Sequence, residues 1–168
     1  MQVLDFGYNS GMKIVVMSDS HGHIANLKHV MGFAKTIGAK AVIHCGDWDT
    51  PEAVNTVLSF GIPLYSVLGN ADIEPEIEEL LKFKSKKFEP NFLKVTIDGQ
   101  KIGITHRMTE RQLPLTESLN VVFSGHYHSK EEKMVNFTTF VRPGALINGL
   151  NFAVYETINN KVEFFEDV

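Results

Sequence analysis

The sequence predicts an α/β protein built as a sandwich of two mixed β-sheets flanked by helices. In the first half, short apolar runs alternate with segments of helical spacing, which is typical of parallel strands joined by crossover helices. In the second half, strand-like runs follow one another through Asn- and Gly-rich turns, which favours antiparallel pairing. No repeat or linker separates the halves, so we expect one domain over residues 1–168, with residues 1–11 as an N-terminal extension.

The first half is expected to form a βαβαβ unit. Its strands are predicted at 13–17, 41–44 and 63–68, and its helices at 24–37, from 51 to near 61, and at 75–81. The strand segments are apolar and rich in β-branched residues, as buried parallel strands are. Gly38 stands where the first helix needs a C-cap, while Thr50 and Pro51 are the N-cap and first residue of the second.

The second half is expected to be mostly antiparallel. Asp98-Gly99 is a strong hairpin signal between strands at 92–97 and 101–104. A helix is predicted from Glu110 to Leu119, although Pro114 disfavours a helix interior. The remaining strands are predicted at 121–123, 133–141, 152–155 and 162–165.

The composition is that of an ordinary soluble globular protein, with 43% hydrophobic and 21% charged residues. The net charge of −4 argues against a broad nucleic-acid footprint, although bound metal would allow small anionic substrates. The single cysteine, Cys45, excludes an internal disulfide and fits a reducing compartment. Neither a secretory signal pattern nor an apolar run of about 20 residues is present, so we expect a cytoplasmic protein without membrane contact.

Five of the predicted strands end in side chains that can bind a metal. These donors are Asp19 and His21, then Asp47, Asn70 and His106, and finally His126 and His128 in the stretch SGHYHS. Any one of them is explained as well by a helix cap, a turn or a solvated side chain. Because open α/β sheets build their sites at the carboxyl ends of strands, five such ends together favour a shared site. Adjacent glycines would let the backbone turn sharply around it.

The donor types indicate the chemistry of this site. Imidazole, carboxylate and amide oxygen suit divalent transition metals better than Ca²⁺ or a thiolate zinc site. Seven donors are too many for one ion that must keep an open position, but they divide well between two. Two ions about 3.5–4 Å apart form the clamp that hydrolyses phosphate esters, and a bridging carboxylate would offset part of their mutual repulsion.

The ordered motifs resemble those of the calcineurin-like metallophosphoesterase superfamily, most closely its small single-domain phosphodiesterases of bacteria and archaea. The motifs are Asp19-x-His21, Gly46-Asp47, Gly69-Asn70, His106 and Gly125-His126-x-His128, and the resemblance covers residues 13–166. It implies a four-layer α/β/β/α fold and a phosphodiesterase in which a metal-bridging hydroxide attacks phosphorus. It also implies two divalent metal ions, with Mn²⁺ preferred and Ni²⁺, Fe²⁺, Co²⁺ or Zn²⁺ as alternatives.

The resemblance also assigns the ligands. Asp19, His21 and His128 would hold one ion, Asn70, His106 and His126 would hold the other, and Asp47 would bridge them. The residues expected to act in catalysis are Asp47, Asn70, Asp72 and His106.

The chain departs from the family where many relatives carry Gly-Asn-His-Asp/Glu, because Ala71 replaces the histidine that protonates the leaving group. We therefore expect a preference for esters with acidic leaving groups. His23 is a candidate substitute acid and substrate contact, or else a solvated loop histidine. Asp72 either orients a ligand or a bound water, or is a turn aspartate. Arg107 and Arg142 are candidate phosphate contacts, or else project into water.

Two other functional classes compete with a phosphodiesterase. The retromer subunit of the same fold is a protein-interaction scaffold with a degraded metal site, whereas all seven donor positions are filled here. A different metallohydrolase, such as an amidohydrolase, is suggested by His-x-His alone but lacks the Gly-Asp and Gly-Asn strand ends. The expected partner is a small phosphoester substrate, and exposed antiparallel edges permit a homodimer.

Overall fold

The computed structural model describes residues 11–167, so most of the expected N-terminal extension lies outside the described residues. The elements of the first half are β1 (Lys13–Met17), α1 (Ile24–Thr36), β2 (Ala41–His44), α2 (Pro51–Leu58), β3 (Leu64–Ser66), α3 (Pro75–Lys84) and β4 (Lys87–Phe88). Those of the second half are β5 (Phe92–Ile97), β6 (Gln100–Thr105), η1 (Glu110–Thr116), β7 (Val121–Phe123), β8 (Lys130–Val135), β9 (Thr138–Pro143), η2 (Leu146–Asn148), β10 (Phe152–Glu156) and β11 (Lys161–Phe165).

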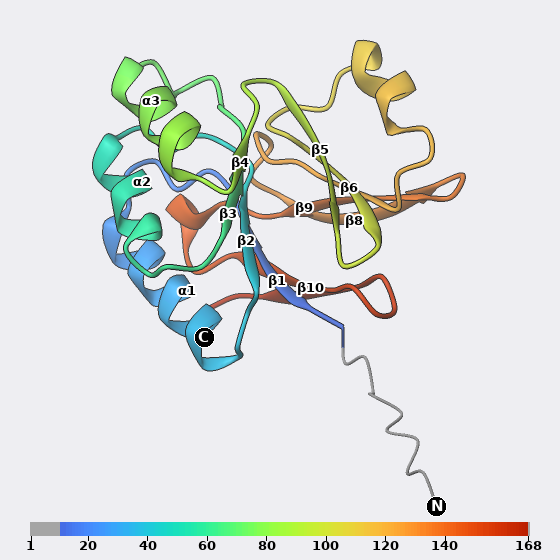
Figure 1. The fold of residues 1–168 in the computed structure, drawn as a ribbon, viewed down its shortest axis with the longest axis horizontal. Helices are drawn as coiled ribbons and strands as arrows, with labels where there is room; N and C mark the ends of the chain where they lie inside the picture. The colour runs from blue at the N-terminus through green and yellow to red at the C-terminus, as the bar shows by residue number, and fades with distance from the viewer. Residues whose placement is uncertain (1–10, 168) are drawn as a thin grey trace, which may run out of the picture.

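Two mixed sheets face each other, and the three α-helices lie on the outer side of one of them (Figure 1). The six-stranded sheet has the order β11-β10-β1-β2-β3-β4, and the five-stranded sheet has the order β5-β6-β7-β9-β8. The predicted sandwich of two mixed sheets flanked by helices is therefore confirmed. Among residues 11–167, no helix combines the length and hydropathy that crossing a bilayer requires.

The βαβαβ unit forms as predicted, because its local signals agree with one another. Strands β1, β2 and β3 pair in parallel. Gly38 follows α1 at φ +68°, a left-handed conformation that glycine adopts without a steric penalty. Thr50 Oγ1 accepts a hydrogen bond from the N–H of Ala53, so it caps α2.

Alternating side chains of β1 build two apolar layers. Val15 and Met17 pack toward the helices, whereas Ile14 and Val16 pack toward the second sheet. All four side chains are fully buried. Burial of such a side chain contributes about 1.5–3 kcal/mol, so the central strand is held firmly on both faces. The ends of β1 are therefore rigid platforms for the loops that follow it.

Two predictions in the second half are wrong. Within the segment 110–119, residues 110–116 form the 3₁₀ helix η1 instead of an α-helix, since Pro114 lacks the N–H that a helix interior needs. The single strand predicted at 133–141 is a hairpin of β8 and β9, which turns at Asn136 with φ +55°.

Pairing in the second sheet also differs from the mostly antiparallel expectation. Strand β7 pairs in parallel with both β6 and β9. The carboxyl ends of β6 and β7 consequently lie at the same edge of their sheet. The loops that follow them meet the loops that follow β1, β2 and β3 in the first sheet.

Candidate metal centre

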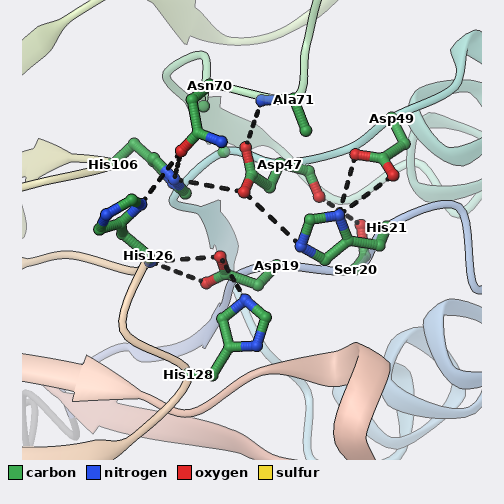
Figure 2. A network of polar contacts seen from close by, with 12 residues as sticks. Asp19, Ser20, His21, Asp47, Asp49, Asn70, Ala71, His106, His126 and His128 are labelled. Carbon is green, nitrogen blue, oxygen red and sulfur yellow. Dashed lines mark hydrogen bonds and ion pairs between the residues drawn. The ribbon is translucent and has the colours of Figure 1, made fainter.

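The seven predicted metal ligands come together at the carboxyl ends of these five strands (Figure 2). Donor atoms of neighbouring ligands lie 3.0–3.6 Å apart. Asp19 and Asp47 are almost fully buried, while the side chain of His128 is 36% exposed. The cluster therefore has a buried carboxylate floor and an open side that a substrate can approach.

The donors form two overlapping groups. Ligand atoms of Asp19, His21 and His128 lie within 4.8 Å of one another, and so do those of Asp19, Asp47 and His106. Asp47 Oδ2 lies between the two halves, 3.6 Å from His21 Nε2 and 3.3 Å from His106 Nε2. Asp47 thus occupies the position expected of a bridging ligand, and Asp19 also contributes to both groups.

Asn70 joins the second half of the cluster. Its Oδ1 lies 3.1 Å from His106 Nε2 and 3.0 Å from His126 Nδ1. The backbone N–H of His126 donates to the Asp19 carboxylate, which links the β7 loop to the end of β1.

Outer hydrogen bonds determine which ring nitrogens are available to a cation. His106 Nδ1 lies 2.8 Å from the carbonyl oxygen of Cys45, which can only accept, so Nδ1 carries the proton. In the neutral ring, Nε2 then has no proton, and its lone pair faces oxygen atoms of Asp47 and Asn70. Such a convergence of lone pairs is unfavourable unless a cation or proton lies among them. The arrangement therefore fits a metal ion.

His21 is held in the same way. Its Nδ1 lies 3.0 and 3.1 Å from the two carboxylate oxygens of Asp49, so the Nε2 lone pair points toward Asp47. A carboxylate behind a metal-binding imidazole fixes the ring and raises its basicity. The N-cap of the helix that follows is Thr50, so the Asp49 carboxylate is left free to hold His21. The sequence signal that could have identified Asp49 is its spacing from Asp47, which places a second carboxylate in the same loop.

The ligand-bearing loops adopt an unusual backbone conformation. Six of their residues have positive φ, namely Asp19, His21, Asp47, Asp49, His126 and His128. A left-handed non-glycine residue costs about 1 kcal/mol or more, so this strain must be offset by packing elsewhere. Gly125 is required for close approach, because a Cβ there would collide with Ser18 Oγ and the Asp19 carboxylate. Such a cradle brings the β1 and β7 loops close enough to share a ligand group.

The electrostatics of the cluster favour an ionised Asp47. Burial opposes its charge, but hydrogen bonds from His106 and the Ala71 N–H, with the charges of His106 and His21, lower the pKa of Asp47 to about 2. Burial also opposes a charge on His106, yet its hydrogen bond and attraction to Asp47 raise the pKa of His106 above the ordinary 6.5. The carboxylate is thus ready to bind a cation, whereas His106 carries a proton that a cation would have to displace only when the pH is below its raised pKa.

Asp72 supports the cluster from behind, and its carboxylate is occupied entirely by backbone groups. Oδ2 accepts hydrogen bonds from the N–H groups of Asp47 (2.9 Å) and Gly69 (2.7 Å), and Oδ1 accepts from Trp48 (2.6 Å) and Asp49 (3.0 Å). Burial raises the pKa of Asp72, with a further contribution from the Asp47 charge, against the effect of these donors. Asp72 therefore clamps the β2 loop to the β3 loop through their backbone groups, and its catalytic role stays a prediction.

A second brace, which sequence reasoning missed, lies on the other side of the β2 loop. The buried His44 accepts a hydrogen bond at Nδ1 from the N–H of Gly46, so its proton lies on Nε2, 3.0 Å from Ser20 Oγ. Its ring stacks on Trp48 at 3.6 Å between centroids. Burial lowers the pKa of His44 well below its usual value, which keeps it neutral. His44, Cys45 and Trp48 are all fully buried.

The three predicted substrate contacts have different surroundings. His23 caps α1, where its Nδ1 accepts a hydrogen bond from the N–H of Asn26. Arg142 pairs with Glu131 at 2.9 Å and lies over the ring of Tyr127. Arg107 is exposed and lines a cavity next to the cluster. Of the three, Arg107 has the surroundings best suited to substrate binding.

Comparison with known proteins identifies relatives of this fold and sequence. The model of the calcineurin-like phosphoesterase superfamily domain matches residues 12–158. The phosphodiesterase MJ0936 of Methanocaldococcus jannaschii is 28% identical over 138 residues, which cover 79% of this chain and 83% of that protein.

Solved structures show the same similarity. A structure described as a novel archaeal phosphodiesterase superimposes with a TM-score of 0.82 and 25% identity, over 92% of this chain and 99% of that chain. Vacuolar protein sorting 29 from Cryptosporidium parvum superimposes with a TM-score of 0.62 and 18% identity, over 92% of this chain and 96% of that chain. The second match concerns the fold alone.

Proposed function

The chain belongs to the calcineurin-like phosphoesterase superfamily and is a phosphoesterase, and we propose that it hydrolyses phosphodiesters with two divalent cations. The proposed ligands are Asp19, His21 and His128 for one cation and Asn70, His106 and His126 for the other, with Asp47 between them. The observation that carries the proposal is the approach of the Nε2 lone pairs of His21 and His106 to the same Asp47 oxygen. Mn²⁺ is the preferred candidate metal, and Ni²⁺, Fe²⁺, Co²⁺ and Zn²⁺ suit the same donors.

When bound, the cations would supply Lewis-acid stabilisation of the phosphoryl group and activation of the attacking water. The residues of the chain position that chemistry. Asp49 and the Cys45 carbonyl hold the protons of His21 and His106 on Nδ1, so that both Nε2 atoms face inward. Asp72 fixes the backbone that carries Asp47. The small phosphoester substrate is proposed to enter from the side where His128 is exposed and His126 is half-buried.

Metal removal tests the proposal directly. Protein dialysed against EDTA is expected to lose hydrolysis of bis(p-nitrophenyl) phosphate and to regain it with Mn²⁺ or another transition metal. Below the raised pKa of His106, cation binding must displace its proton, so metal affinity should fall as pH decreases through that pKa. Calorimetry in buffers of different ionisation enthalpy should detect the released protons. Full activity in EDTA would rule out the metal mechanism.

The leaving group should strongly affect the rate. Ala71 occupies the place of the general acid in many relatives, and a missing acid typically costs about 10²–10⁴-fold for poor leaving groups. Across a series of aryl diesters, log(kcat/KM) is therefore expected to fall steeply as the leaving-group pKa rises. Ala71→His should flatten this dependence, since only the backbone N–H of Ala71 contacts Asp47. A flat dependence in the unmodified enzyme would contradict the role given to Ala71.

A non-catalytic scaffold is the second candidate, because vacuolar protein sorting 29 shares the fold. A scaffold would be expected to have lost some of its metal ligands, whereas all seven donors are present here and converge. Stoichiometric metal binding without hydrolysis of any phosphoester would favour the scaffold. The homodimer and the cytoplasmic location stay predictions.

A further inference from the structure

A cavity of about 560 Å³ adjoins the proposed second metal site. Asn70, His106 and His126 form one of its walls, and these are the ligands gathered on the left in Figure 2. A phosphoryl group held at the metal centre would therefore direct one of its substituents into this cavity. Its volume is sufficient for a substituent much larger than a methyl group.

Other lining residues come from the end of β6, the start of η1 and the segment between them, and their polar groups hydrogen-bond to one another. Gln112 Nε2 donates to Thr105 Oγ1 at 3.0 Å, and Gln112 Oε1 accepts from the N–H of Thr109 at 3.0 Å. The Thr105 hydroxyl donates in turn to the carbonyl of Asn91 at 2.9 Å. These hydrogen bonds brace this part of the cavity lining.

Arg107 is the charged side chain of this cavity that is not committed to another group. Within residues 11–167 it makes no ion pair, whereas Arg142 is neutralised by Glu131. The described residues that line the cavity include no Asp or Glu. Arg107 and His126 line the same cavity. The cavity thus has a positive charge at the edge of the metal cluster.

We propose that this cavity is a subsite for one ester substituent of the substrate, and that Arg107 selects a substituent carrying a negative charge. The proposal rests on the proposed function, because the phosphoryl group must lie at the metal centre for its substituent to enter the cavity. A guanidinium suits a carboxylate or a second phosphate, since both accept paired hydrogen bonds. A cationic substituent would be repelled.

Three phosphonates of similar length test the proposal on the metal-loaded protein: 2-carboxyethylphosphonate, propylphosphonate and 2-aminoethylphosphonate. By titration calorimetry, affinity should decrease in that order, with about a tenfold difference between the first and last, as for a partly screened charge pair. Arg107→Gln should abolish the difference, and Arg107→Glu should reverse the order. Arg111→Gln is the matched control, because Arg111 is an exposed arginine on η1 outside the cavity lining, and it should preserve the order.

The outcomes separate this inference from the proposed function. Equal affinities, absent binding, or an order unchanged by Arg107→Gln would overturn the subsite. Hydrolysis of bis(p-nitrophenyl) phosphate, which carries no charged substituent, is measured on the same samples. If no metal supports this hydrolysis, the phosphodiesterase proposal is refuted, regardless of the phosphonate affinities.

Discussion

Asp47→Ala is expected to lower hydrolysis below detection and to reduce bound metal at both sites. Asp47 Oδ2 lies between His21 Nε2 and His106 Nε2, so its loss removes a donor from each half of the cluster. The effect should exceed the roughly 10–100-fold that follows loss of an outer-shell partner, because Asp47 itself is proposed to contact the cations. Metal content after dialysis and kcat/KM for bis(p-nitrophenyl) phosphate are the measurements.

His128→Ala is the matched comparison for this variant. His128 belongs to one donor group, and its side chain is partly exposed. Its loss should weaken one metal while leaving most of the other in place. Full retention of metal by Asp47→Ala, or equal loss from both variants, would contradict the assignment of Asp47 as the shared ligand.

Asp72→Asn is expected to destabilise the protein and to weaken metal binding, although Asp72 is not a proposed ligand. Asparagine has one acceptor oxygen, so its side-chain NH₂ group, which cannot accept, would face two of the four backbone N–H donors. Each buried donor left unsatisfied costs about 1–3 kcal/mol, so the loss of stability should be about 2–6 kcal/mol. Metal affinity should fall about 10–100-fold, since the clamped loop carries Asp47.

The control for Asp72→Asn is Glu74→Gln, which removes a carboxylate two residues away. Glu74 is exposed and its side chain makes no capping hydrogen bond to α3, so this variant should match the unmodified protein. Urea denaturation of the metal-free protein measures the clamp, and metal titration measures its effect on the site. Unchanged metal affinity in Asp72→Asn would show that the clamp serves stability alone.

Much of the fold could be predicted because its signals are local. The apolar runs of β1 and β2 and the caps of α1 and α2 each depend on a few adjacent residues. Strand β8 was not distinguished from β9, and its first residues were not predicted as strand, because its sequence, KEEKMV, has no alternation of apolar and polar residues. It lies at a sheet edge, where no buried face demands such a pattern.

The parallel pairing of β7 could not be predicted from its own residues. A three-residue apolar strand such as Val121–Phe123 is buried in the same way whichever direction its neighbours run. The direction depends on where the chain returns after η1 and after the β8–β9 hairpin. That return brings the carboxyl end of β7, with His126 and His128, to the metal cluster.

The chemical identity of the donors and their places at strand ends follow from the sequence, because residue type and strand pattern are local properties. The packing of the two sheets, in contrast, makes Asp19 a member of both donor groups, lets Asp72 clamp backbone groups, and leaves Arg107 rather than Arg142 without an ion pair among the described residues. These relations join residues far apart in the chain, and their distances depend on how two sheets pack. The ring nitrogen that His106 can offer to a cation also depends on tertiary contacts, because its ring is oriented by the Cys45 carbonyl, 61 positions away in the chain.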